Sequence, residues 1–475
     1  MSGANDLRIS KTHAADPYSR SKARGLRRYS WLRIETVTAW FSDTDISREA
    51  RGASRIAPPF SVPACFVPYA PDCLVARIYG SFPASSMRSP QTSGAALLPG
   101  QRHLFDIPDD VAFLNCAYMS PLPKVSVAAG ARGLARKAQP WIITPDDFFG
   151  ASETVRTRFA DLINAAPDDV AFAPAVSYGM AQATANITLV RTQTIVTLAE
   201  EFPSNVYPWM DLAQRTGAQF IAVPRPGDGD WTAALLSAIN TATGVVAVPH
   251  CHWTDGGFID LEAVGNACRS VGAVLCVDGT QSVGALPFDV KRIDPDYLAV
   301  ASYKWLLGPY SFGFLYVAPR RQGERPIEHN WIARRGSQDF AGLVNYQREF
   351  QDGARRFDVG ERSNFALMPV ADASLKLIAD WTVPRILATL ARRTEAIAAR
   401  ARAEFGLGSV PSDRRAGHYL GLRFRGGVPA DLPAQLAAQH VHVSVRGAAM
   451  RVTPHLWTTD ADVERLFAVL RGAVA

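Results

Sequence analysis

The chain of 475 residues is long enough to bury a large core and to form more than one domain. Its hydrophobic content of 48% and charged content of 20% are typical of a globular protein in water. No run of about eighteen apolar residues occurs, so we expect no membrane partner. The six cysteines are sparse and lack CxxC spacing, which argues against a disulfide scaffold and a zinc site and favours a reducing, cytoplasmic location.

The net charge of +6 belongs to the N-terminal segment, residues 1–99, which holds 13 basic and 7 acidic residues. The remainder of the chain is neutral, so its charge gives no reason to expect a nucleic-acid partner. The segment is rich in Ser, Arg, Pro and Ala and has no sustained helical or strand period. We predict a disordered basic extension or a chain that starts at Met87. A targeting peptide is less favoured because Asp6 and Asp16 depart from the acid-poor composition of transit peptides.

Residues 100–369 are predicted to form a large domain. After an opening segment at 104–123, an amphipathic helix is expected over 151–164, where Val155, Phe159 and Leu162 recur at helical spacing. Apolar strands then alternate with helices, and we expect them at 194–200, 219–224, 244–250, 273–278 and 297–302. This alternation predicts an α/β domain whose mainly parallel sheet is covered on both faces.

Residues 370–475 are predicted to form a smaller C-terminal α+β domain that begins after a break at Pro369. Long helices are expected at 371–380 and 385–404, followed by short strands within 419–426, 441–447 and 450–454. A final helix is expected over 460–474.

Asp278 and Lys304 follow two consecutive predicted strands, and they are the most informative residues of the chain. Burial of a lysine among apolar and aromatic neighbours lowers its pKa and yields a neutral, nucleophilic amine. An acid held apart from that amine can pair with a cationic ring nitrogen. These are the two protein groups that pyridoxal phosphate requires, namely a Schiff-base lysine and a carboxylate partner for the pyridinium.

The spacing of these residues resembles the core pattern of the class V aminotransferase family, in which Asp-x-x-Gln is followed some twenty residues later by Ser-x-Lys. This family includes cysteine desulfurases, kynureninases and isopenicillin N epimerase-like proteins. The resemblance implies fold type I and pyridoxal phosphate as the cofactor. It also implies that Gln281 bonds to the phenolic oxygen of the cofactor and that Ser302 and Tyr303 bind its phosphate.

Two further segments resemble cofactor-binding parts of the family. Ser177 and Tyr178 open a predicted helix, whose free backbone N–H groups suit a phosphate. In the second segment, Glu-Phe-Pro-Ser-Asn, Phe202 takes the place of a histidine that stacks on the cofactor ring, and Asn205 is a candidate polar contact.

The resemblance also implies substrate-binding residues and a second subunit. Asn115 lies in an opening segment that family members place over the active site, and Arg451 falls at the position that binds the substrate α-carboxylate, with Arg446 as a second candidate. The segment 355–365 resembles one that reaches the neighbouring subunit's active site, so we expect a homodimer. Glu361 stands there in place of a threonine, and Arg362 or the backbone would have to replace its phosphate contact.

The spacing His250-x-His252 is compatible with a metal, but no third ligand is evident and we expect no metal site. The segment from Arg446 to Met450 lacks the cysteine that desulfurases use, so desulfuration is disfavoured. Transamination of an amino acid is the leading prediction. A lyase of the kynureninase or C–S lyase kind and an epimerase remain alternatives, and a non-enzymatic regulator is the least favoured.

Overall fold

A computed structural model describes residues 94–473 of the chain, and these residues lie in one compact unit. The predicted extension therefore falls outside the described residues up to position 93, Met87 included. Its last residues differ from the prediction, because Leu98 is 8% exposed and its backbone N–H donates to Thr389 Oγ1. The described fold begins before residue 100.

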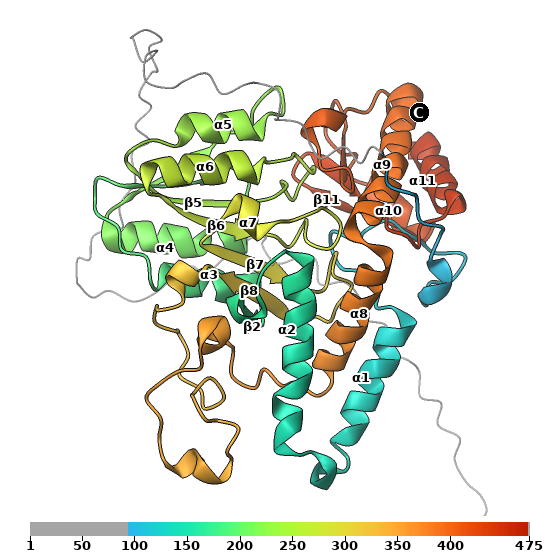
Figure 1. The fold of residues 1–475 in the computed structure, drawn as a ribbon. Helices are drawn as coiled ribbons and strands as arrows, with labels where there is room; N and C mark the ends of the chain where they lie inside the picture. Colours follow the sequence, from blue (N-terminus) through green and yellow to red (C-terminus); the bar gives the residue numbers. More distant parts are fainter. Residues whose placement is uncertain (1–93, 474–475) are drawn as a thin grey trace, which may run out of the picture. The chain divides into compact units, whose positions relative to one another are not determined.

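The centre of the fold is a seven-stranded sheet in the order β2-β8-β7-β6-β5-β3-β4 (Figure 1). β3 to β7 pair in parallel, whereas β8 runs antiparallel to both of its neighbours. The strands are β2 (Val170–Ala173), β3 (Thr194–Leu198), β4 (Gln219–Val223), β5 (Thr243–Pro249), β6 (Val274–Asp278), β7 (Tyr297–Ala301) and β8 (Gly313–Val317). The five predicted strands correspond to β3 to β7, and the sequence did not predict β2 and β8.

Helices cover both faces of this sheet, because successive side chains of each buried strand point to opposite faces. Alternate residues of β6 illustrate this: Leu275 and Val277 join one apolar cluster, and Cys276 joins the other. The first cluster packs against α2 (Gly150–Leu162), α5 (Trp231–Ala238), α6 (Leu261–Val271), α7 (Val290–Ile293) and α8 (Leu367–Trp381). The second packs against α3 (Val176–Thr184) and α4 (Tyr207–Thr216).

The C-terminal part forms a third apolar cluster around a small antiparallel sheet in the order β11-β12-β9. Its strands are β9 (Leu420–Arg423), β11 (Ser444–Arg446) and β12 (Ala449–Val452), packed with α9 (Val383–Phe405), α10 (Leu432–Ala438) and α11 (Asp460–Ala473). β1 (Ala112–Phe113), from the N-terminal side, pairs with β10 (Val441–His442). The opening segment of the predicted large domain therefore belongs partly to the C-terminal layer.

The predicted break at Pro369 falls inside a helix, which begins two residues earlier. α8 begins at Leu367, so Pro369 lies in its first turn, where a backbone N–H has no helical partner and its loss is tolerated. α8 packs against α1 (Lys124–Arg136) and α2 rather than opening a separate domain.

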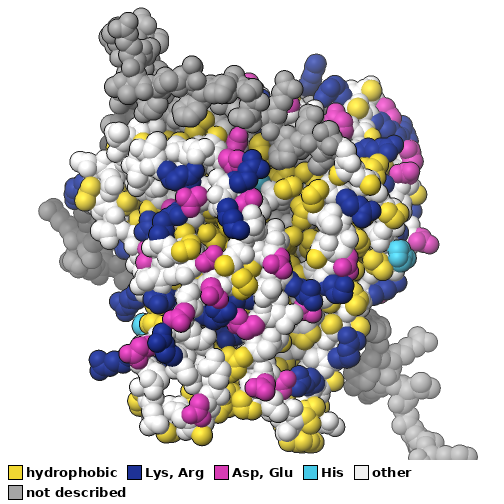
Figure 2. Space-filling model, in the orientation of Figure 1, with side chains coloured by type: hydrophobic (Ala, Val, Ile, Leu, Met, Phe, Trp, Pro, Cys, Tyr) yellow, Lys and Arg dark blue, Asp and Glu magenta, His cyan; other side chains and the backbone are white. Residues whose placement is uncertain are grey.

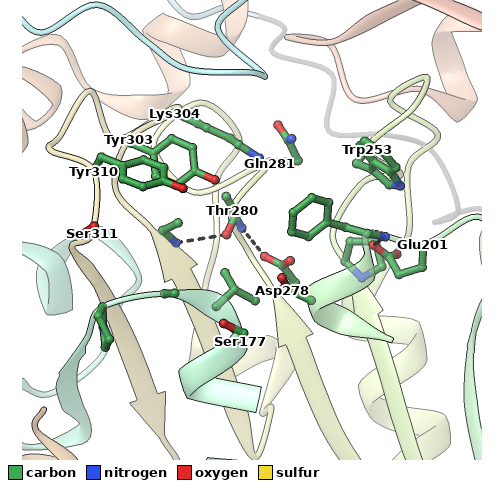
Figure 3. Close-up of a pocket in the computed structure, with 17 residues that line it drawn as sticks. Ser177, Glu201, Trp253, Asp278, Thr280, Gln281, Tyr303, Lys304, Tyr310 and Ser311 are labelled. Atoms are coloured by element: carbon green, nitrogen blue, oxygen red, sulfur yellow. Dashed lines mark hydrogen bonds between the residues drawn. The ribbon is translucent and has the colours of Figure 1, made fainter. Parts of the chain in front are cut away.

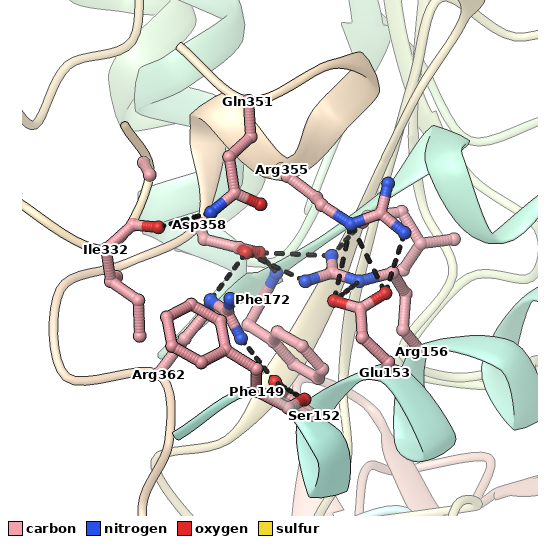
Figure 4. Close-up of polar contacts among 12 residues, drawn as sticks. Phe149, Ser152, Glu153, Arg156, Phe172, Ile332, Gln351, Arg355, Asp358 and Arg362 are labelled. Atoms are coloured by element: carbon pink, nitrogen blue, oxygen red, sulfur yellow. Dashed lines mark hydrogen bonds and ion pairs between the residues drawn. The ribbon is translucent and has the colours of Figure 1, made fainter. Parts of the chain in front are cut away.

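A buried ion network, which we call the Asp358 network, ties the segment after η8 (Gly353–Phe357) to α2 and β2 (Figure 4). The Asp358 carboxylate accepts hydrogen bonds from Arg156 and from the backbone N–H of Phe172, and it pairs with Arg362 Nε at 2.9 Å. The side chains of Arg156 and Asp358 are 0% exposed and that of Arg362 is 1% exposed. Two buried guanidinium groups thus share one carboxylate.

Candidate active site

The carboxyl ends of β3, β5, β6 and β7 meet at one edge of the sheet, where they surround a cavity of about 390 Å³ (Figure 3). Ligands collect at this edge in open α/β sheets because the loops that follow parallel strands converge there. The polar and aromatic side chains of its wall are Ser177, Glu201, Phe202, Ser204, Trp253, Asp278, Thr280, Gln281, Tyr303, Lys304, Tyr310 and Ser311.

Lys304 lies three residues beyond the end of β7 and is only 7% exposed. Its Nζ is 5.4 Å from the ring centroid of Phe202 and 5.5 Å from that of Tyr303. Burial lowers the pKa of Lys304 to about 8, although the negative charge of Asp278 opposes this shift. At pH 7 the neutral amine fraction accordingly rises from about 0.03% at the ordinary pKa to about 9%.

The loop that carries Lys304 is closed by Ser302, which corrects one predicted role. The Ser302 hydroxyl donates to the carbonyl of Pro309 at 2.6 Å, and its own carbonyl accepts the backbone N–H of Gly308. A Cβ at Gly308 would lie 2.8 Å from the Ser302 Cβ, so the turn depends on glycine there. Ser302 does not line the cavity and positions the lysine loop instead of offering a phosphate contact.

Asp278 is the last residue of β6 and is 6% exposed. Its Oδ1 accepts the backbone N–H of Thr280 at 2.9 Å, and the Thr280 hydroxyl in turn accepts the N–H of Ala301 on β7. Burial raises the pKa of the Asp278 carboxyl, while the contacts from Thr280 and the charge of Lys304 counteract that rise. A desolvated carboxylate of this kind is stabilised by a cationic partner.

Gln281 lines the cavity wall between Asp278 and the opening segment. Its Nε2 donates to the carbonyl of Ala117 at 3.1 Å, and its Oε1 accepts from Trp305 Nε1 at 3.0 Å. One N–H of the amide group is therefore used within the protein, and the second is available to a ligand.

The start of α3 forms another wall of the cavity, and Ser177, a predicted cofactor contact, lies in that wall. No side chain caps this helix, so its first backbone N–H groups suit an anion. The side chain of Tyr178 is not part of the lining. Its hydroxyl donates to Glu328 Oε2 at 2.9 Å, and Glu328 Oε1 accepts the N–H of Gly360.

The segment after β3 places Phe202 in the wall, whereas Asn205 is fully buried outside it. The side-chain oxygen of Asn205 accepts from Trp209 Nε1 at 3.2 Å, and its Nδ2 has no hydrogen-bond partner.

Sequence reasoning missed Glu201, which lines the cavity beside Phe202 and is 6% exposed. Burial raises the pKa of Glu201 to about 8, and the nearby Asp278 charge adds to the shift. Thr280, Tyr310 and Ser311 were also missed. The doubled Glu200-Glu201 before Phe202 was the only available signal, since nothing in the sequence told which glutamate is buried.

Arg451 and Asn115 lie next to the cavity lining and are joined by Ser444. Arg451 is 2% exposed, and its Nε donates to Ser444 Oγ at 2.8 Å. The Ser444 hydroxyl donates to Asn115 Oδ1 at 2.9 Å. Another Arg451 nitrogen donates to the carbonyl of Trp253, a residue of the wall. Asn115 thus positions Arg451 through Ser444 and does not itself line the cavity.

The structure bears on two further sequence-based suggestions, a phosphate contact from Arg362 and a metal site at His250 and His252. Arg362 cannot replace the missing threonine contact, because its guanidinium is held inside the Asp358 network. His250 packs against Phe258 and Phe288, whereas His252 stacks on Trp231. Within residues 94–473, no group of three or more His, Cys, Asp or Glu side chains is placed to hold a metal ion.

Four histidines are buried, each at most 5% exposed, and two of them, His418 and His455, contact Trp305 of the lysine loop; the other two are His250 and His252. His418 Nε2 lies 2.7 Å from the carbonyl oxygen of Gln281, and its ring is 4.4 Å from that of Trp305. Burial lowers the pKa of all four, to about 3 for His250 and His455 and about 4 for the other two. The four rings are neutral at pH 7.

The donor set of this cavity fits pyridoxal phosphate. An amine of lowered pKa, a buried carboxylate, an aromatic face and an uncapped helix start with a hydroxyl correspond to its aldehyde, pyridinium, ring and phosphate.

A family model described as aminotransferase class-V matches residues 146–463, and the chain belongs to this family. Its members are pyridoxal phosphate-dependent enzymes, so the predicted family, enzyme class, fold type I architecture and cofactor are confirmed.

Two curated relatives differ in their activities. An uncharacterised aminotransferase of Bacillus subtilis is 31% identical over 208 residues, which are 43% of this chain and 55% of that protein. The isopenicillin N epimerase of Streptomyces clavuligerus is 29% identical over 181 residues, which are 37% of this chain and 46% of that enzyme. The chain spans about half the length of these relatives.

Two solved structures share the fold at low sequence identity. A cysteine desulfurase from Thermococcus onnurineus superposes with a TM-score of 0.68 at 20% identity, covering 78% of this chain and 97% of that chain. A mutant of C-DES with glycine covalently linked to its pyridoxal phosphate gives 0.70 at 19% identity, covering 78% and 98%.

Among the described residues, no helix has the length and apolar character needed to cross a membrane.

Proposed function

We propose that this enzyme is an aminotransferase that acts on an α-amino acid through Lys304. The observation that carries this proposal is the arrangement of Lys304 and Asp278 at the carboxyl ends of neighbouring parallel strands, with Arg451 beside the same cavity. The cofactor, when bound, supplies an electron sink for charge that develops at the substrate α-carbon.

The residues of the cavity would divide the work as follows. Lys304 would hold the cofactor through its neutral amine and would take up and return the substrate α-proton at Nζ. The buried Asp278 carboxylate would stabilise a positive charge on the ring nitrogen of the cofactor. Ser177 and the first N–H groups of α3 would hold the phosphate, and Arg451 would orient the substrate by its α-carboxylate.

A persulfide mechanism is disfavoured by the turn between β11 and β12, which is Gly447-Ala448 and contains no cysteine. The cysteines within the described residues are Cys116, Cys251, Cys268 and Cys276, and all four are buried. Their burial raises the pKa of each thiol, which opposes thiolate formation.

A lyase or epimerase is the second candidate, favoured by the phenols of Tyr303 and Tyr310 in the cavity wall. Their ring centroids are 4.7 Å apart, and burial raises the pKa of Tyr303 to about 12. A protonated phenol at this place could donate a proton to a leaving group or to the opposite face of the α-carbon.

The visible absorption spectrum of the purified protein tests these assignments. We expect a band from bound pyridoxal phosphate that is lost in Lys304→Ala and retained in Lys376→Ala, a change at an exposed lysine on α8. An amino acid that bleaches the band until a keto acid restores it would indicate transamination. Release of a keto acid while the band persists would indicate a lyase, and loss of substrate chirality alone an epimerase. Absence of any band after pyridoxal phosphate is added would refute the proposal.

We further propose a homodimer in the cytoplasm. Large apolar side chains gather at the lower edge of the face in Figure 2, over η2 (Pro140–Ile142) and the loop after η7 (Ala341–Val344). Trp141 is 77% exposed there and Tyr346 94%. Tyr310, which lines the cavity, is 62% exposed, and a second subunit could cover it. Light scattering of the purified protein measures the subunit number.

A further inference from the structure

One face of the β11–β12 hairpin carries two arginines and a serine. Ser444 pairs with Arg451 and Arg446 pairs with Ala449 in the antiparallel register. Since side chains two residues apart share a face of a strand, Ser444, Arg446 and Arg451 all point to the same side. Both arginines approach one residue of the cavity wall, because their Cζ atoms lie 5.9 Å and 5.7 Å from the ring centroid of Trp253.

Neither arginine has an acidic partner among the described residues. Arg451 donates only to neutral oxygens, those of Ser444, Tyr419 and Trp253. Arg446 donates to the carbonyl of its neighbour Val445.

Other buried arginines of the chain are paired with carboxylates. Arg156 and Arg362 are held by Asp358, and Arg415 by Glu395. The two arginines of the hairpin therefore differ from the other buried arginines, which have carboxylate partners. Their like charges repel each other. Partial burial and, to a smaller extent, this repulsion lower the pKa of Arg446.

The positive charges of Arg451 and Arg446 act on Lys304 inside the cavity. Both Arg451 and Arg446 lower the pKa of the Lys304 amine, which places the three cations in one electrostatic environment. A substrate α-carboxylate would neutralise Arg451 and leave Arg446 unpaired. An acid group on the substrate side chain would neutralise the second arginine.

We propose that Arg446 forms a second anion subsite and that the preferred substrate is an amino acid with an acidic side chain. Carboxylate, phosphate and sulfonate groups share the chemistry that a guanidinium recognises. This inference rests on the proposed function, because it takes Arg451 as the ligand of the α-carboxylate.

The test uses the holoenzyme and pairs of ligands that differ in one charge. Dissociation constants are measured from the visible band for aspartate against asparagine, glutamate against glutamine, and O-phosphoserine against serine. In the wild type we expect at least one acidic member to bind about tenfold or more tightly than its neutral partner, the factor that corresponds to 1.4 kcal/mol. In Arg446→Gln this ratio should fall to about one while the neutral member is unaffected. Arg402→Gln, at an exposed position of α9, is the matched control for loss of a charge.

The inference would be overturned by a wild-type preference that survives in Arg446→Gln, or by an equal loss of affinity for both members of each pair. The second would mean that both arginines serve the α-carboxylate. No preference for acidic members in the wild type would also refute it.

Maleate and butyrate separate this inference from the proposed function, since neither has an amine to react at Lys304. Thermal shifts are compared at equal ligand concentration. Stabilisation by maleate but not butyrate, lost in Arg446→Gln, would support the subsite even if no amino acid changed the visible band. Equal thermal shifts with maleate and butyrate would refute the second anion subsite, as would the results named in the preceding paragraph.

Discussion

The pH at which Lys304 becomes reactive is a direct consequence of its burial. The neutral amine attacks the aldehyde of pyridoxal phosphate, so the rate of cofactor attachment follows the neutral fraction. With the pKa lowered to about 8, that fraction is about 1% at pH 6, about 9% at pH 7 and about 50% at pH 8. The rate should therefore rise about 50-fold between pH 6 and pH 8 and only about twofold more by pH 10.

Stopped-flow mixing of the cofactor-free protein with pyridoxal phosphate measures this rate from the growth of the visible band. The same experiment with Nα-acetyl-lysine, after division by the neutral fraction of that ordinary amine, gives the cofactor's own pH dependence, by which the rate of the protein is then divided. An ordinary lysine would instead continue to gain about tenfold per pH unit up to pH 10.

Two variants move the plateau in opposite directions. Asp278 raises the pKa of Lys304 and Arg451 lowers it, so Asp278→Asn should move the plateau to lower pH and Arg451→Gln to higher pH. A rate that rises log-linearly through pH 9.5, or variants that shift in the same direction, would refute the reasoning.

Three other predictions concern stability and substrate positioning. Asp358→Asn should lower the free energy of unfolding, measured by urea titration, by about 3–5 kcal/mol, because the buried guanidinium groups of Arg156 and Arg362 lose the carboxylate that they share. A loss below about 1 kcal/mol would contradict the stabilising role of the Asp358 network. Ser444→Ala should raise KM with little change in kcat, since it frees the Nε of Arg451 without touching Lys304, and an unchanged KM would remove Ser444 as a positioning residue. The four buried histidines have pKa values below their unfolded value, so the unfolded chain binds more protons in acid. Stability should fall as pH drops from about 6.5 towards 4, by up to about 1.4 kcal/mol per pH unit for each histidine, and equal urea midpoints at pH 7 and pH 5 would contradict this.

The strands that hold the site could be predicted from sequence because each is a short apolar run followed by a polar residue. Asp278 and Lys304 were recognisable for that reason, and the parallel arrangement then brought them to one edge. β2 and β8 were missed because their four and five residues carry no distinctive alternation, and β8 becomes a strand only by pairing with β7 and β2.

Roles that depend on the direction of a single hydroxyl or amide could not be predicted. Ser302 was expected to face the phosphate, but the turn at Gly308 places the Pro309 carbonyl 2.6 Å from the Ser302 hydroxyl, which donates to it. Tyr178 turns to Glu328, which is far from it in sequence. Likewise, whether Glu200 or Glu201 is buried depends on where β3 ends, because adjacent side chains point to opposite sides.

The convergence of four strand ends on one cavity also makes the cofactor a probe of folding. Ser177, Phe202, Asp278 and Lys304 are distant in sequence, and no single supersecondary unit contains them all. Contacts between such distant segments form late when loop closure is costly. The visible band should therefore recover only after far-ultraviolet circular dichroism during refolding, and its amplitude would count molecules whose central sheet is completely assembled.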